Sequence, residues 1–230
     1  MATIFLAGAT GAIGRPLATL LLRAGHAVVG TTRSADKGPV LGALGVTPVV
    51  VDAYDADALR EAVSAARPEI VIHQLTDLPA GMATDDMAAA LERNSRLREI
   101  GTANLVAAAR AAGSRRLIAQ SLAFVYAPAP LPHSEADPID PAARGVLSLE
   151  AQVMAASCEA VILRYGRLWG PGTGFEAPNP ACPVHVEAAA QAAALAVERG
   201  AGAYNIAEET GEVATERARR DLGWDAEFRL

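Results

Sequence analysis

The chain of 230 residues has few cysteines and a single lysine, and each of these two shortages argues against a class of protein. Its two cysteines, Cys158 and Cys182, have no Cys-x-x-Cys pair around them, which argues against a disulfide framework and predicts free thiols and a cytoplasmic location. No apolar run of about 18 residues occurs, so no membrane span is expected. With a single lysine, Lys37, and a net charge of −6, the chain lacks the basic surface that nucleic acid would require.

What the chain does contain is a high share of apolar residues, 51%, which is enough to bury a sizeable core. The length suits one α/β domain with a small appendage. The opening run, residues 3–7, is strand-like and has no charged segment before it, so a secretion signal is not expected.

Apolar runs and helical patterns alternate along the sequence. Strands are expected at residues 4–7, 28–32, 46–51, 69–73, 116–120, 160–164 and 203–206, and helices at 14–24, 57–66, 85–112, 143–157, 183–199 and 213–222. Residues 127–141 hold five prolines and predict a loop. Strands separated by helices pair in parallel through right-handed crossovers. The pattern therefore predicts an α/β fold with a Rossmann-like, doubly wound parallel sheet.

The stretch "GATGAIG" lies where the first strand turns into the first helix. Small residues at this turn let the backbone approach a diphosphate, and the free N–H groups at the helix start stabilise its charge. A tight turn without a ligand is the alternative. We expect a dinucleotide to be held by Gly8, Thr10, Gly11, Ala12, Ile13 and Gly14.

The end of the second strand, "GTTRS", bears on which dinucleotide is bound. A carboxylate there would bind the adenosine ribose of NAD, whereas Arg33 offers a planar fork for a 2′-phosphate, with Ser34 beside it. The sequence thus favours NADP, with NAD as the other possibility. A solvated surface arginine is the simpler interpretation of Arg33.

Together with the glycine turn, several further stretches make the chain resemble the extended short-chain dehydrogenase/reductase family, also called the NAD-dependent epimerase/dehydratase family. These stretches are "VVVDAYDADAL", "VIHQLT", "ERNSRLREIGTANLVAAARAAGSRRLIAQS" and "LRYGRLWGPGTG". The resemblance implies that Asp52 meets the adenine amino group and that the cofactor is also contacted by Gln74, Leu75, Thr76 and Asn94. It further implies a substrate loop containing Arg167 and Trp169.

The resemblance also implies an organisation of the chain. Residues 1–126 would form the dinucleotide-binding core, and residues 127–230 the remaining sheet elements with a short C-terminal substrate-binding portion of the same domain. Members of this family commonly form dimers through two long helices, here residues 85–112 and 143–157. A homodimer is therefore expected, although alanine-rich helices also simply pack on a sheet.

The chain departs from the family in one chemical feature. The usual Tyr-x-x-x-Lys pair, which exchanges a proton with the substrate, is absent, because Lys37 lies on the wrong side of the cofactor. Four residues after the tyrosines Tyr54, Tyr126, Tyr165 and Tyr204 stand Ala58, Pro130, Trp169 and Glu208. Ordinary alcohol-dehydrogenase chemistry is therefore in doubt.

Three other hydroxyl groups are candidates for the chemistry. Ser121, at the end of the fifth strand, would polarise a carbonyl or simply end the strand. Tyr126 would donate a proton or pack in the core, and Tyr165 would stabilise developing negative charge. His133 on the proline-rich loop would reach the substrate if the loop folds over it. No histidines share a metal-ligand spacing, so no metal site is expected.

These observations leave three functions open for a chain whose partner is a small-molecule substrate. The first is an NADP(H)-dependent oxidoreductase with an atypical active site, acting on a small carbonyl-type substrate. The second is a sensor or scaffold that binds NADP without turning it over. The third is a sugar-nucleotide epimerase or dehydratase.

Overall fold

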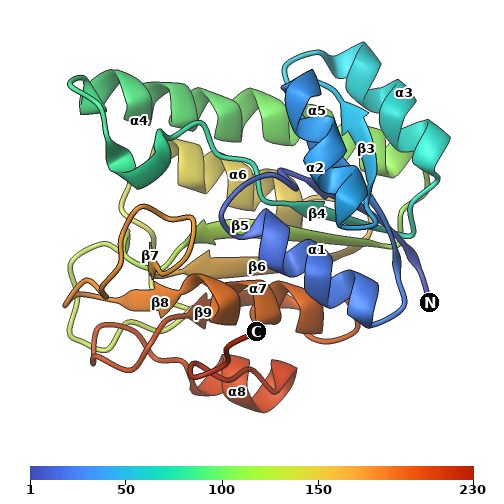
Figure 1. The fold of residues 1–230 in the computed structure, drawn as a ribbon. Coiled ribbons are helices and arrows are strands. Elements are labelled where there is room, and N and C mark those ends of the chain that lie inside the picture. The colour runs from blue at the N-terminus through green and yellow to red at the C-terminus, as the bar shows by residue number, and fades with distance from the viewer.

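The computed structural model describes residues 1–230, apart from the side chain of Ala80. Seven parallel strands form one sheet in the order β3-β2-β1-β4-β5-β6-β9 (Figure 1). A second, two-stranded parallel sheet pairs β7 with β8. The strands are β1 Thr3–Ala7, β2 Ala27–Thr32, β3 Thr47–Val50, β4 Ile70–His73, β5 Arg116–Leu122, β6 Glu159–Tyr165, β7 Arg167–Trp169, β8 Pro183–His185 and β9 Gly202–Ile206.

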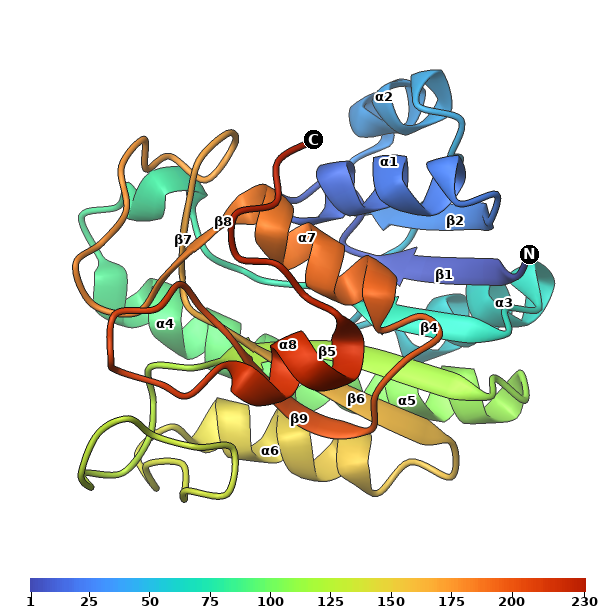
Figure 2. The ribbon, with the colours of Figure 1, turned by 90° about the horizontal axis from the view of Figure 1, so that it is seen from below.

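Helices cover both faces of the sheet. They are α1 Gly14–Arg23, α2 Gly38–Ala43, α3 Ala56–Ala66, α4 Met87–Arg96, α5 Thr102–Ala111, α6 Arg144–Met154, α7 Val186–Leu195 and α8 Glu216–Leu222. Figure 2 shows α1 and α7 on one side of the sheet and α5 and α6 on the other. Among the described residues, no helix combines the length and apolar character needed to cross a membrane.

The alternation of side chains along each strand divides the core into two layers. In β1, Ile4 and Leu6 join the cluster beneath α1 and α7, whereas Phe5 and Ala7 join the cluster beneath α3, α5 and α6. Both clusters are built from residues that are almost completely buried. A sheet that is apolar on both faces is what parallel strands with crossover helices require.

The doubly wound parallel sheet expected from the sequence is confirmed, with four local corrections. The helix expected at 85–112 is interrupted by a π-helical turn, Leu97–Gly101. The helix expected at 183–199 starts only at Val186, because residues 183–185 pair with β7 and the His185 ring caps the helix. The helix expected at 213–222 starts at Glu216. The short helix α2 was not expected from the sequence.

The strand order places a topological switch point between β1 and β4, at the carboxyl ends of the strands. The chain winds outward from β1 to β3 and then returns to β4 on the other side of β1. Ligands of open α/β sheets bind at such a switch point, outside the carboxyl ends of the strands. The same edge carries the proline-rich loop and the β7–β8 sheet, on the side to which the arrows of β5 and β6 point in Figure 1.

Two glycines near α1 differ in how much space a side chain would find. A Cβ on Gly14 would overlap the backbone of Gly8 and Ala9, whereas a Cβ on Gly25 would meet no atom within 4 Å. We expect Gly14→Ala to lower the free energy of unfolding by about 1–3 kcal/mol through overpacking. Gly25→Ala should lower the free energy of unfolding by only about 1 kcal/mol, because alanine is disfavoured in the left-handed backbone conformation of this position. Urea denaturation of both variants compares these losses, and equal losses would show that the turn moves aside from Gly14.

Candidate functional site

The glycine turn packs closely against the end of β4. Gly8 has φ of +90°, and a Cβ there would come within 2.6 Å of the Gln74 carbonyl oxygen. The turn closes through a hydrogen bond from the Gly11 amide to the Gly8 carbonyl, 3.1 Å. No side chain caps the start of α1 in the described structure. The amide groups of residues 12–14 have no hydrogen-bond partner among the described residues and so remain available for an anion at the switch point.

On the β2 side of the turn, two arginines converge on one carboxylate. Arg33 lies 3.1 Å from Asp77, and Arg93 lies 4.0 Å from the other oxygen of the same side chain. The Asp77 amide donates a hydrogen bond of 2.8 Å to Asn94, which is buried. The structure thus joins Arg33 and Asn94 through Asp77. Sequence reasoning missed Asp77, although it directly follows the quoted "VIHQLT" stretch.

The remaining residues expected at this end of the cofactor lie in local turns. The Ser34 hydroxyl donates to Asp36. Asp52 accepts a hydrogen bond of 3.0 Å from the Tyr54 amide, and the side chain of Thr76 is exposed. Each of them follows the carboxyl end of a strand, so all lie along the edge that holds the switch point.

The end of β4 presents a buried amide with one free oxygen. Gln74 Nε2 donates to the Tyr165 hydroxyl at 3.2 Å, but Gln74 Oε1 is enclosed and has no hydrogen-bond partner among the described residues. The preceding residue, His73, contacts the Thr102 hydroxyl at 3.0 Å. Burial, together with the charge of Arg98, lowers the pKa of His73 to about 4, so this imidazole is neutral at pH 7.

Two of the three candidate hydroxyls belong to one buried cluster. The Ser121 hydroxyl donates to Glu150 at 2.6 Å, and Arg164 donates to both oxygens of Glu150 at 2.9 and 2.7 Å. Arg164 also donates to the Tyr126 hydroxyl at 2.9 Å, which in turn donates to Asn205 at 2.6 Å. We call these five side chains the Glu150–Arg164 cluster. It links β5, α6, β6 and β9 near the carboxyl ends of these strands.

The third candidate, Tyr165, lies apart from this cluster and is only 1% exposed. Burial raises the pKa of the Tyr165 phenol and also that of Tyr126. A phenol with a raised pKa is a weaker acid at neutral pH, the opposite of what a proton donor needs. Burial alone would lower the pKa of Arg164, because it disfavours the charged guanidinium. The hydrogen bonds and the negative charge of Glu150 outweigh this effect and raise the pKa of Arg164 above its usual range.

A small cavity of about 160 Å³ opens beside the Glu150–Arg164 cluster. Its lining includes His133, which stacks on Tyr126 with ring centroids 4.8 Å apart, and Arg167, whose guanidinium lies 4.2 Å from the centre of the Phe124 ring. The structure therefore brings two of the three expected substrate residues together. Trp169 is not in the lining, because its indole N–H donates to Glu208 at 2.7 Å.

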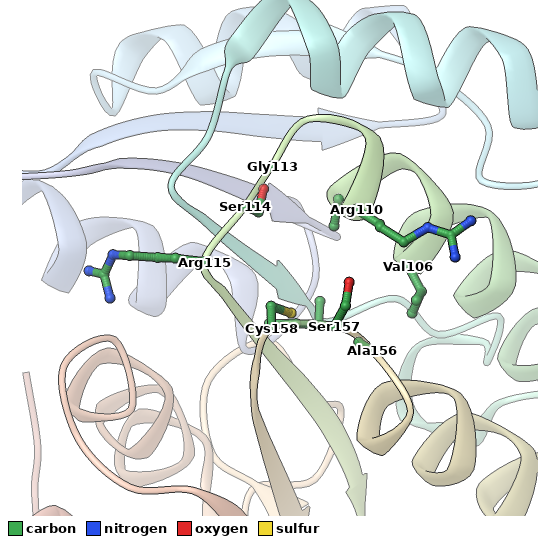
Figure 3. A pocket seen from close by; sticks show the side chains of 10 residues that line it. Val106, Arg110, Gly113, Ser114, Arg115, Ala156, Ser157 and Cys158 are labelled. Atoms are coloured by element: carbon green, nitrogen blue, oxygen red, sulfur yellow. The ribbon is translucent and has the colours of Figure 1, made fainter.

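A larger hollow of about 260 Å³ lies at the opposite edge of the sheet, between the end of α5 and the starts of β5 and β6 (Figure 3). Its Ser114 hydroxyl donates to the Pro68 carbonyl at 2.8 Å, and Arg110 and Arg115 extend in opposite directions from it. This hollow lies at the amino ends of β5 and β6, opposite the switch point, so it is not the expected dinucleotide site. Within the described part of the chain, no group of three metal-ligating side chains occurs.

Comparisons with known proteins agree with this geometry. A family model described as NAD(P)H-binding matches residues 8–195. A 3-diazoavenalumate denitrifying reductase of a Streptomyces species is 46% identical over 182 residues, which is 75% of this chain and 58% of that protein. The chain thus spans less than two thirds of the length of that relative.

Two solved structures share the fold. The Bordetella bronchiseptica enzyme WbmH, in complex with NAD+, superposes with a TM-score of 0.80 at 20% identity, over 100% of this chain and 94% of that one. A UDP-glucose 4-epimerase of Thermotoga maritima, with UDP-glucose, gives a TM-score of 0.79 at 18% identity, over 99% and 94%. At such identities the likeness concerns the fold alone.

The Glu150–Arg164 pair makes a prediction about stability. Glu150→Ala leaves Arg164 buried without its carboxylate, which should lower the free energy of unfolding by about 3–5 kcal/mol. The double variant Glu150→Leu with Arg164→Met should recover most of this loss, because it removes both charges. Glu61→Ala, at an exposed position of α3, is the control and should change stability by less than about 0.5 kcal/mol. Urea denaturation measures all three, and a Glu150→Ala variant as stable as the control would contradict a structural role for the pair.

Proposed function

Because the chain belongs to the NAD(P)H-binding family, we propose that it is an NADP(H)-dependent reductase that passes hydride to a small electrophile without a proton donor of its own. The observation that carries this proposal is the state of the candidate hydroxyls. Ser121 and Tyr126 are tied into the Glu150–Arg164 cluster, and the pKa of Tyr165 is raised. Hydride transfer itself depends mainly on orientation of the two reactants.

The residues at the switch point fit a nicotinamide dinucleotide. The glycine turn approaches β4 too closely for a side chain, and the uncapped start of α1 suits the diphosphate. Gln74 Oε1, buried without a partner, suits the amide N–H of the nicotinamide carboxamide. When bound, the cofactor would supply hydride, and the glycine turn and Gln74 would hold its diphosphate and its carboxamide.

The charges beyond β2 support NADP over NAD. Two guanidinium groups, from Arg33 and Arg93, share the single carboxylate of Asp77 and leave a net positive charge. The planar guanidinium group of Arg33 can bind the 2′-phosphate of NADP through two hydrogen bonds. The Asp77 carboxylate repels this phosphate and competes with it for Arg33. We therefore assign Arg33 as the phosphate-binding residue and Asp77 as the residue that weakens this preference.

The missing proton donor bears on the class of substrate. Reduction of a carbonyl needs a proton as well as a hydride, which water in the cavity near His133 would have to supply. A diazonium electrophile needs none. Hydride adds to the terminal nitrogen of R–N₂⁺ to give the neutral diazene R–N=NH. The N–H and C–N bonds of the diazene then break, its hydrogen passes to the carbon of R and N₂ leaves, so that R–N₂⁺ and hydride together give R–H and N₂ with no proton taken from outside. The likeness to a 3-diazoavenalumate denitrifying reductase favours the diazo class for this chain too.

A homodimer is part of the proposal. Four large apolar side chains are exposed on the helical layer formed by α4, the π-helical turn and α6. Their exposed fractions lie between 38% and 53%, and they are Leu91, Ile100, Leu147 and Met154. Exposed apolar side chains gathered on one layer are typical of a subunit interface.

Cofactor preference is tested with two substitutions. Arg33→Met should weaken NADPH binding about 10- to 100-fold, the value of a lost charge-assisted contact, with little effect on NADH. Asp77→Asn should tighten NADPH binding several-fold by removing repulsion, again with little effect on NADH. Asp57→Asn, at an exposed site on α3, is the matched control. Fluorescence titration gives the Kd values, and equal effects on both cofactors would place the phosphate elsewhere.

The substrate class is tested by following NADPH absorbance with an arenediazonium salt, a quinone and an aldehyde. We expect turnover of the diazonium salt with release of N₂, at a rate that changes little between about pH 5.5 and 7.5, because no protein group titrates in the step. Ser121→Ala should keep this rate within about 10-fold, less than the loss of a general acid. Tight NADPH binding with no turnover of any electrophile would favour a sensor that binds NADP without turning it over. Loss of activity in Ser121→Ala would show that the serine takes part in the reaction.

A further inference from the structure

Arg98 is a buried arginine for which the described structure provides no partner. It lies in the π-helical turn between α4 and α5 and is 7% exposed. Its Nε is enclosed without a hydrogen bond, and none of the described residues forms an ion pair with its guanidinium. π-Helical turns occur often at functional sites. A buried, unpaired charge is costly, so a ligand is the natural source of the missing partner.

The groups around Arg98 cannot take the place of an anion. Its neighbour His73 is neutral and already accepts a hydrogen bond from the Leu75 amide, 3.2 Å, while contacting Thr102. Burial lowers the pKa of Arg98 to about 10, with no acidic side chain to offset it. The guanidinium therefore keeps its charge at pH 7 and remains without a counter-ion in the described structure.

The position of Arg98 separates it from the cofactor's phosphates. The diphosphate belongs at the start of α1, which covers one face of the sheet, whereas the turn that carries Arg98 joins α4 and α5 and packs against α6 on the other face (Figure 2). The 2′-phosphate belongs beside Arg33, beyond β2. Arg98 instead lies one helical turn before Thr102, whose hydroxyl contacts His73 at the end of β4, 3.0 Å away, and the nicotinamide half would lie at this end of the sheet.

We propose that Arg98 binds the anionic group of the substrate, a carboxylate, and so holds small organic anions beside the nicotinamide. The proposal rests on the function proposed above and narrows its substrate to electrophiles that carry a carboxylate. A guanidinium fork and a carboxylate match in geometry and form two parallel hydrogen bonds. Arg98 thus selects and orients the substrate, and the chemistry remains a hydride transfer.

The experiment compares wild type with Arg98→Met and Arg98→Lys, using 4-hydroxycinnamate and its neutral amide as probes. Binding is measured by calorimetry on the protein saturated with NADPH, and NADPH affinity is measured separately by fluorescence. We expect the carboxylate to bind wild type at least 10-fold more tightly than the amide. Arg98→Met should lose this preference, Arg98→Lys should recover part of it, and all three should bind NADPH within about 3-fold of one another.

Thermal unfolding shows whether the variants fold. Because Arg98→Met removes an unpaired buried charge, its Tm without ligands should be at or above that of wild type. Equal affinity of wild type for the carboxylate and the amide would overturn the proposal. So would a loss of NADPH affinity in Arg98→Met, which would assign the arginine to the cofactor. If wild type fails to bind NADPH, the proposed function is wrong, and the same carboxylate–amide comparison on the free protein still decides the role of Arg98.

Discussion

The ion pair between Glu150 and Arg164 is the interaction on which the C-terminal half of this protein depends. It joins a crossover helix to the centre of the sheet, and through Tyr126 and Asn205 it reaches the last strand. Glu135 of the proline-rich loop accepts the Asn205 amide at 2.9 Å, so the loop is held by the same network. A buried pair of this kind is stable only when every remaining polar atom is satisfied, and here Ser121 and Tyr126 complete it.

This architecture has a chemical consequence. The hydroxyls that would be candidates for proton transfer contribute to stability, and burial raises the pKa of both phenols. The reductase that we propose would depend on the relative orientation of the nicotinamide and its electrophile. Electrophiles that become neutral on accepting hydride suit such a site, because no alkoxide has to be protonated.

Three buried arginines show how differently one side chain can be used. Arg116 donates to the backbone carbonyls of Ala196, Arg199 and Gly200 and pairs with Glu159, so it fixes the start of β5 against the end of α7. Arg164 is satisfied by a carboxylate and a phenol. Arg98 has neither in the described structure, and it lies toward the ends of the strands, where ligands bind. The contrast between satisfied and unsatisfied guanidinium groups separates structural positions from a candidate binding position.

The sequence by itself determined the architecture and the cofactor class. Alternating apolar runs and helical patterns impose parallel pairing, and "GATGAIG" after a strand predicts a turn that a diphosphate can approach, because both follow from local periodicity and from the size of side chains. Absence of the tyrosine–lysine pair could also be read directly.

Only the tertiary structure decided which side chains meet. The π-helical turn that buries Arg98, the sharing of Asp77 by Arg33 and Arg93, and the pairing of β7 with β8 join residues brought together by packing of separate elements. Ser121 and Glu150 are 29 residues apart, and no spacing in the sequence indicates their hydrogen bond. Local preferences fix the elements, but burial and charge compensation between elements fix the site, and these are properties of the folded chain.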